Sequence, residues 1–124
     1  MKKLFFFCFI TLTLCFTINS FAQVNQDFTL VNNTGETIYK LFVAPVTDSE
    51  SWGSNLLGNK PLKNGQSIEV SFDKSSFPDD CVWDLKVHDK EGNTLSWFDI
   101  DLCRYFKITL HWDPAKGEGS AELE

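Results

Sequence analysis

Apolar and polar residues alternate along short segments of the chain, and this alternation predicts β-strands that bury one face. The predicted strands are 28–31, 37–44, 66–72, 81–88, 94–102 and 106–112. Asn, Gly and Pro residues separate them, and no long window has the period of an amphipathic helix. The pattern predicts an all-β domain, specifically a small antiparallel β-sandwich of the immunoglobulin-like type with about six to seven strands.

Turn signals predict how some of these strands connect. The stretch 32–35, Asn-Asn-Thr-Gly, lies between the first two strands, so we expect those strands to form a hairpin. Residues 46–65 are the least regular part of the chain and are expected to cover one end of the core. After Pro114 the sequence is polar, and residues 115–124 are expected to form a flexible tail.

The fourth and fifth predicted strands flank a turn and should form a hairpin. Their apolar faces meet when the numbers of paired residues sum to 183, which sets Leu85 opposite Phe98. That register turns Cys103 away from Cys81. We therefore expect a β-bulge or a strand end near 102–104 to bring the two cysteines back to the same side.

Residues 1–22 have the layout of a secretory signal peptide. Two lysines precede an apolar run at 4–16, and Ala22 offers a cleavage site before Gln23. The run is too short for a membrane helix, which needs about 20 apolar residues. Neither cysteine in the run follows a small residue, as an acylated cysteine would. We expect residues 23–124 to be exported as a single domain, either periplasmic or extracellular.

Cleavage changes the charge of the protein. Loss of Lys2 and Lys3 takes the formal net charge from −6 to −8. An anionic surface disfavours nucleic acid, because phosphate binding needs Lys and Arg to displace counterions. It disfavours acidic membranes for the same reason. We therefore expect no nucleic acid and no membrane as a partner of the cleaved protein, and a protein or a glycan as the partner class.

Cleavage also reduces the cysteines to Cys81 and Cys103. In an oxidising compartment an even pair predicts a disulfide bond. No C-x-x-C spacing is present to indicate a metal site or catalytic redox chemistry. The bond would close a loop of about 23 residues, which is worth roughly 3 kcal/mol in the chain-entropy model. We expect it to hold the mouth of the predicted hairpin together.

The predicted register also gathers three carboxylates on the outer face of this hairpin. Asp84 falls opposite Asp99, and Asp101 lies two residues further along the same strand. Clustered carboxylate oxygens are ligands for Ca²⁺. The same cluster is more typical of a solvated acidic face that discourages aggregation, and no EF-hand spacing occurs to favour the metal site. The sequence leaves both interpretations open and indicates no other cofactor.

Aromatic residues are a second set of candidates. Alternation predicts Phe98 and Phe106 in the core, with Trp97 and Trp112 facing away from it and Trp52 in a loop. Exposed tryptophans can stack on sugar rings or anchor a protein partner. They can also simply cover the edges of sheets.

Catalytic motifs are absent from the sequence. There is no G-x-S-x-G, H-E-x-x-H or phosphate-binding glycine loop, and both His88 and His111 sit at outward positions of predicted strands. We therefore assign no catalytic residue and do not expect an enzyme. The leading expectation is an exported binding or scaffolding module. The alternatives are a Ca²⁺- or carbohydrate-binding module and, third, a secreted hydrolase or hydrolase inhibitor.

Several short motifs carry a family resemblance. They are N-N-T-G-E-T-I-Y-K-L-F-V at 32–43, W-G-S-N-L-L-G at 52–58, N-G-Q-S at 64–67, C-V-W-D-L at 81–85 and D-I-D-L-C at 99–103. With these the chain resembles a group of small secreted bacterial β-sandwich domains of uncharacterised function. The resemblance implies export and a compact β domain. It implies no enzymatic activity and no catalytic residues.

Overall fold

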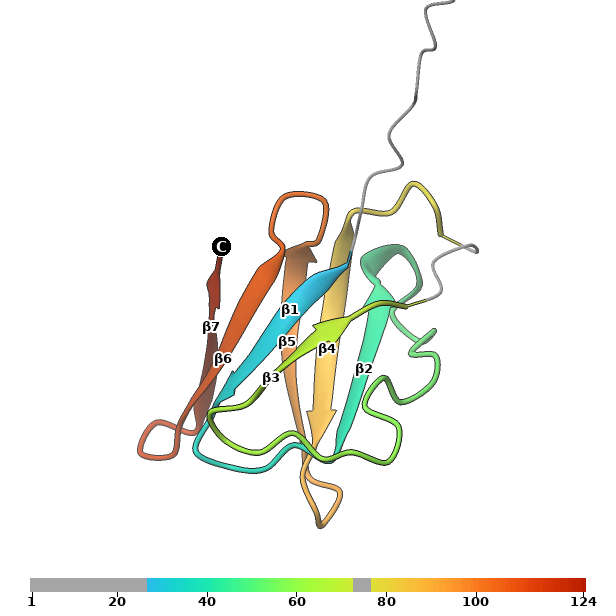
Figure 1. Ribbon diagram of the computed structural model, residues 1–124. Coiled ribbons are helices and arrows are strands. Elements are labelled where there is room, and N and C mark those ends of the chain that lie inside the picture. Colours follow the sequence, from blue (N-terminus) through green and yellow to red (C-terminus); the bar gives the residue numbers. More distant parts are fainter. Residues whose placement is uncertain (1–26, 73–76) are drawn as a thin grey trace, which may run out of the picture.

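The computed structural model describes residues 27–72 and 77–124 (Figure 1). The predicted signal peptide, residues 1–22, lies outside this range. The described chain is all-β, with seven strands in two sheets, one 3₁₀ turn and no α-helix. In this part of the chain no helix is long and apolar enough to span a membrane.

One sheet has four strands and the other has three. The order in the first is β3 (Ser67–Val70), β1 (Phe28–Asn33), β6 (Lys107–Asp113) and β7 (Glu118–Leu123). The order in the second is β2 (Lys40–Pro45), β4 (Val82–His88) and β5 (Thr94–Asp101). The 3₁₀ turn, η1 (Val46–Asp48), follows β2. One core is shared by the two sheets, with fully buried Leu30, Ile108 and Leu110 from one and Leu41 and Leu85 from the other.

The predicted hairpin between the first two strands is wrong. β1 pairs with β3 and, in parallel, with β6, whereas β2 pairs with β4 in the other sheet. The parallel pair also departs from the purely antiparallel expectation, and the long stretch of chain between β1 and β6 makes it possible. The cause lies at Asn32, whose buried side chain binds the carbonyls of Glu36 and Leu62. These bonds hold the chain in a turn that leads from one sheet to the other.

The β4–β5 hairpin forms as predicted, but its register changes along its length. Trp83 pairs with Ile100 in the predicted register, and Leu85 then pairs with Trp97 instead of Phe98. Two residues of β5 therefore oppose Asp84, which is a β-bulge. This bulge, at Phe98 and Asp99, was not predicted, since irregular geometry was expected only near 102–104; Asp99 has a φ of 59°.

The bulge reverses which aromatic side chain of β5 enters the core. Trp97 is only 6% exposed and Phe98 is 66% exposed, the opposite of the prediction. The Trp97 indole packs over Gly119 of β7, and its Nε1 donates to the carbonyl of Ser120 at 3.0 Å. Trp97 thus joins the two sheets. This partner strand explains why the larger aromatic side chain is the buried one.

The predicted flexible tail is also wrong for most of its length. Residues 118–123 form β7, which pairs antiparallel with β6 across a turn at Gly117. The pairing is held by packing of Ala121 and Leu123 against the core and by a 3.3 Å ion pair between Lys107 and Glu124. Phe106, predicted to be buried, is 70% exposed.

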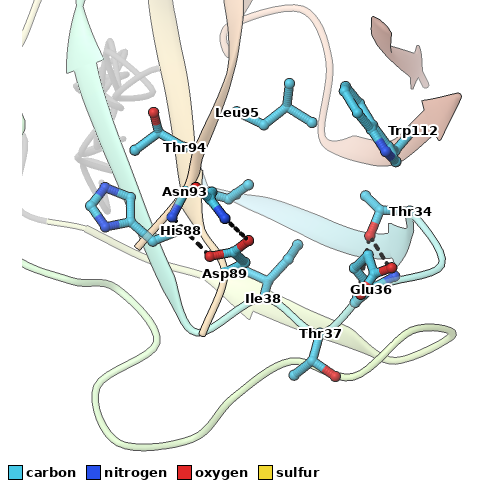
Figure 2. A pocket seen from close by; sticks show the side chains of 11 residues that line it. Thr34, Glu36, Thr37, Ile38, His88, Asp89, Asn93, Thr94, Leu95 and Trp112 are labelled. Atoms are coloured by element: carbon cyan, nitrogen blue, oxygen red, sulfur yellow. Dashed lines mark hydrogen bonds between the residues drawn. The ribbon is translucent and has the colours of Figure 1, made fainter. Parts of the chain in front are cut away.

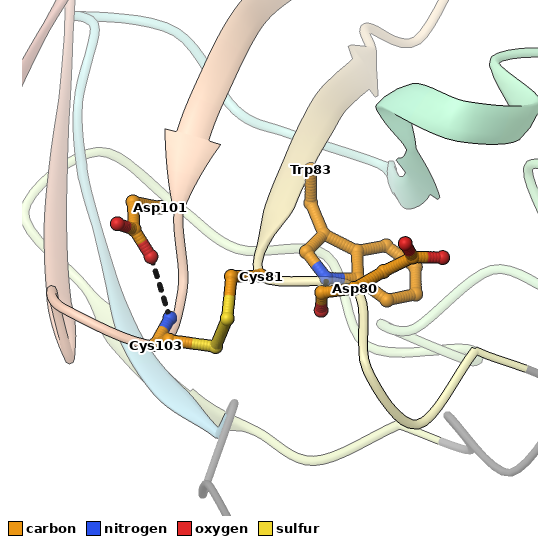
Figure 3. The surroundings of a disulfide bond; sticks show 5 residues. All are labelled: Asp80, Cys81, Trp83, Asp101 and Cys103. Carbon is orange, nitrogen blue, oxygen red and sulfur yellow. Dashed lines mark hydrogen bonds between the residues drawn. A yellow bond between two sulfur atoms is a disulfide. The ribbon is translucent and has the colours of Figure 1, made fainter.

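The disulfide bond between Cys81 and Cys103 is confirmed (Figure 3). It joins the start of β4 to the turn after β5, with the two Cα atoms 5.1 Å apart. The carboxylate of Asp101 accepts a hydrogen bond from the Cys103 N–H at 3.0 Å. β5 ends at Asp101, and the turn that follows brings Cys103 beside Cys81, so the strand end predicted near 102–104 is confirmed and the alternative of a bulge there is not needed.

Candidate functional site

The three carboxylates predicted to gather do not converge. Asp84 is 7% exposed and accepts the backbone N–H of Asp99 at 3.0 Å, so its charge stabilises the bulge. Asp101 instead accepts the N–H of Cys103. Among the described residues, the potential metal ligands whose atoms all lie within 4.8 Å are Cys81, Asp101 and Cys103. The two cysteines of that group are consumed by the disulfide bond, so the placement of these residues lends no support to a Ca²⁺ site.

The three candidate tryptophans do not share a face. Trp97 is buried between the sheets, which corrects its assignment as an exposed binding residue. Trp52 lies in the loop after η1 with its ring 4.3 Å from the Lys86 ammonium. Trp112, predicted to face away from the core, has the same parity on β6 as buried Leu110 and lines a cleft. Trp52 lines a separate, smaller cavity of about 260 Å³, whereas Trp112 lines the larger cleft described next.

This cleft lies between the ends of the two sheets and has a volume of about 460 Å³ (Figure 2). The β1–β2 connection and the β4–β5 turn meet at this end of the molecule, opposite the end where β4 begins and β5 ends (Figure 1). The lining residues are Thr34, Glu36, Thr37, Ile38, Val87, His88, Asp89, Asn93, Thr94, Leu95 and Trp112. Ile38 and Val87 are buried and give the cleft an apolar base, while Glu36, Asn93 and Thr94 are exposed around it.

Asp89 shapes the side of the cleft that belongs to the β4–β5 turn. Its carboxylate accepts the backbone N–H groups of Glu91 at 3.0 Å and Asn93 at 2.8 Å, and the Asn93 amide at 2.9 Å. The hydrogen bond from the Asn93 side chain is the main reason that the pKa of Asp89 lies below its usual value. The turn therefore presents a fixed negative charge beside the polar amide of Asn93.

Asn32 and Thr34 shape the opposite side. The Thr34 hydroxyl donates to Asn32 Oδ1 at 2.7 Å, and the Glu36 N–H lies 3.2 Å from the same hydroxyl. These bonds fix the backbone of Glu36 and leave its carboxylate at the exposed rim. The sequence analysis missed Asn32 as a structural centre. The signal was present in the Asn-Asn-Thr-Gly turn, which was interpreted as a simple hairpin loop.

His88 lies where the cleft meets the outer face of the three-stranded sheet. Its ring is 5.2 Å from that of Phe42, and its Nε2 has no hydrogen-bond partner among the described residues. Burial lowers the pKa of His88, and the charges of Lys86 and Lys40 lower it further, while Asp89 opposes them. The imidazole is therefore neutral at neutral pH.

The second histidine belongs to a different part of the molecule. His111 Nδ1 is 3.2 Å from the Asn33 amide nitrogen, and its Nε2 is 3.3 Å from a Glu122 carboxylate oxygen. These contacts join β6 to its neighbours β1 and β7. His111 therefore helps to hold the strands of the four-stranded sheet together, and it does not line the cleft.

Comparisons with known proteins assign no family to the chain. No family, no curated protein and no solved structure matches it. The interpretation of the cleft rests on its own residues and their geometry.

Proposed function

We propose that the protein is an exported, non-catalytic binding module with an immunoglobulin-like sandwich architecture, and that its ligand occupies the cleft between the sheet ends. The observation that carries the proposal is the composition of this cleft. It has a buried apolar base, one tryptophan wall and polar groups from both sheets around its mouth. Small-molecule sites typically occupy about 300–1,000 Å³ and combine these same elements.

A neutral carbohydrate is the ligand class that this lining favours. The ring of Trp112 offers an apolar surface for the C–H face of a sugar. Asn93, Thr37 and Thr94 offer hydrogen-bond donors and acceptors for hydroxyl groups. The carboxylates of Glu36 and Asp89 repel an anion, so an acidic ligand is disfavoured inside the cleft.

Catalysis is not part of the proposal. No serine or cysteine lines the cleft, and the hydroxyl of Thr34 donates to the Asn32 amide, which is not a base that could activate it. His88, the histidine in the lining, sits beside two lysines that disfavour its protonation. His88 therefore offers a neutral imidazole for a polar contact to a ligand.

Binding of neutral oligosaccharides tests the proposal through tryptophan fluorescence and calorimetry. Trp112→Ala should weaken binding by about tenfold or more, because aromatic anchors in binding sites contribute about 2 kcal/mol or more. Phe106→Ala is the matched control, since this exposed aromatic residue precedes the opposite end of β6. An equal loss of affinity in both variants, or an affinity unchanged by Trp112→Ala, would mean that the ligand does not bind in the cleft.

Export has its own test. The mass of the intact protein recovered from outside the cytoplasm should correspond to a chain that begins at Gln23. A retained N-terminus, or a lipid attached to Cys15, would contradict the signal-peptide prediction.

A further inference from the structure

Four side chains form a compact group on the outer face of the three-stranded sheet. Lys40 pairs with His88, and Phe42 pairs with Lys86, across the β2–β4 register. Residues opposite each other in an antiparallel pair project from the same face of the sheet. The residues between them, such as Leu41 and Val87, are buried in the core. Lys40, Phe42, Lys86 and His88 therefore share the outward face and are called the basic quartet below.

The ammonium group of Lys86 is positioned by aromatic rings. Its Nζ lies 4.3 Å from the centroid of the Trp52 ring and 5.3 Å from that of Phe42. Cation–π contacts of this kind orient an ammonium group without using a carboxylate. Within the described residues, neither Lys86 nor Lys40 forms an ion pair; the ion pairs found there involve Lys107 and His111. The two lysines thus present uncompensated charge in a defined place.

The local field is positive although the protein is acidic overall. The chain carries a formal net charge of −6, whereas the basic quartet contains two lysines and no acid. Lys86 and Lys40 both act to lower the pKa of His88, which reports their proximity to the imidazole. The nearest acids in the sequence are Asp84, which is buried and bonded to the Asp99 N–H, and Asp89, whose charge offsets part of the effect of the two lysines on His88. The quartet is thus a local reversal of the protein's overall charge.

We propose that the basic quartet, together with Trp52, binds the carboxylates of an acidic polysaccharide built from uronic acids. Lys40 and Lys86 pair with carboxylate groups, and the rings of Phe42 and Trp52 contact the apolar faces of sugar rings. The acidic remainder of the protein repels double-stranded DNA more strongly than a polyuronate, because the DNA backbone is densely charged. His88 connects this face with the cleft (Figure 2). The proposal holds whether or not the cleft itself is occupied.

Titration of residues 23–124 with oligogalacturonate tests the proposal, with a neutral galactose oligomer of the same length as the reference ligand. We expect binding of the oligogalacturonate alone at this face, and weaker binding as salt screens the charges. Lys86→Gln should weaken the affinity by about tenfold, as expected for loss of a charge-assisted hydrogen bond. Lys116→Gln, the same substitution in the turn between β6 and β7, is the control. It removes one positive charge away from the quartet and should leave the affinity for oligogalacturonate nearly unchanged.

The imidazole of His88 gives a second readout that does not depend on a substitution. Bound carboxylates favour the protonated ring, so the pKa of His88 measured by NMR should rise in the complex. If Lys86→Gln fails to fold, Lys40→Gln takes its place in the affinity measurement. An unchanged His88 titration would overturn the proposal.

Three affinity results would also overturn it. One is equal binding of the neutral oligomer, which would mean that the carboxylates are not recognised. Another is equal or tighter binding of poly-glutamate or of an oligonucleotide, because the face would then recognise charge without sugar. The third is an equal loss in Lys116→Gln. Loss of neutral sugar binding in Trp112→Ala affects only the proposed function of the cleft, so failures of the two proposals are distinguishable.

Discussion

Replacement of Asn32 by leucine tests how the chain passes from one sheet to the other. The Asn32 side chain is fully buried, and its amide uses its whole hydrogen-bonding capacity. Nδ2 donates to the carbonyls of Glu36 at 2.7 Å and Leu62 at 2.9 Å. Oδ1 accepts the Thr34 N–H at 3.1 Å and the Thr34 hydroxyl at 2.7 Å. Leucine has a similar size and can make none of these bonds.

The expected loss follows from the groups left without a partner. A buried polar group that loses its hydrogen bond costs about 1–3 kcal/mol. The Thr34 hydroxyl can turn to the Glu36 carbonyl, which lies 3.2 Å away, so part of the network recovers. The Leu62 carbonyl keeps its bond from the Leu62–Ile38 bridge. We therefore expect a loss of about 3 kcal/mol, from a total of about 5–15 kcal/mol for a domain of this size.

Urea unfolding of residues 23–124 measures this loss through the midpoint at constant slope. The melting temperature should fall by about 10–20 °C. Asn33→Leu is the control, since the neighbouring Asn33 is exposed and its amide contacts His111. If Asn32→Leu unfolds within about 0.5 kcal/mol of this control, the buried amide network does not hold the turn, and the reasoning fails.

Three further variants test the core, the hairpin mouth and the quartet. Gly119→Ala would set a Cβ 3.1 Å from a carbon of the Trp97 ring, so thermal melting should show a loss of about 1 kcal/mol; unchanged stability would mean that the indole is free to move. A Cys81→Ala/Cys103→Ala variant should lose about 2–4 kcal/mol in urea unfolding and keep its β-type circular dichroism, and free thiols in the unfolded wild type would contradict the bond. Because the folded-state pKa of His88 is lowered from 6.5, the folded state binds fewer protons, and stability falls as the pH drops through that value and levels off below the folded pKa. His88→Gln should flatten this part of the pH–stability profile, and an unchanged profile would assign the fall to other groups.

The β4–β5 hairpin and its disulfide bond were predictable because local signals agreed on them. Alternation in 82–88, a turn at Gly92 and a cysteine beyond each strand end all indicate the same pair. The position of the β-bulge in β5 was not predictable from the sequence. Trp97 and Phe98 are adjacent aromatics, and either can occupy the core when one residue is inserted. The choice depends on Gly119, which leaves room for the indole from a strand 22 residues later in the sequence.

The cleft was predictable only in part. Trp112 was recognised as a candidate binding aromatic from its residue type, but its surroundings come from the β1–β2 connection and the β4–β5 turn. Those segments meet because Asn32 directs the chain into the second sheet, a tertiary effect of one buried amide. β7 was missed because an edge strand with few apolar residues resembles a solvated tail. Of the residues of β7, only Ala121 and Leu123 pack against the core. Two apolar residues do not predict a strand by themselves, and they are buried here because β7 pairs with β6.

The central claim is that the cleft between the sheet ends is the ligand site, and chemical-shift mapping tests it most directly. Backbone amide spectra of ¹⁵N-labelled residues 23–124 would be recorded during titration with neutral oligosaccharides. The account predicts shifts centred on residues 34, 36–38, 87–89, 93–95 and Trp112, which line the cleft, and an unchanged spectrum elsewhere. Saturable shifts centred instead on the loop at Trp52, or on the turn at Cys103, with the cleft residues unmoved would contradict it.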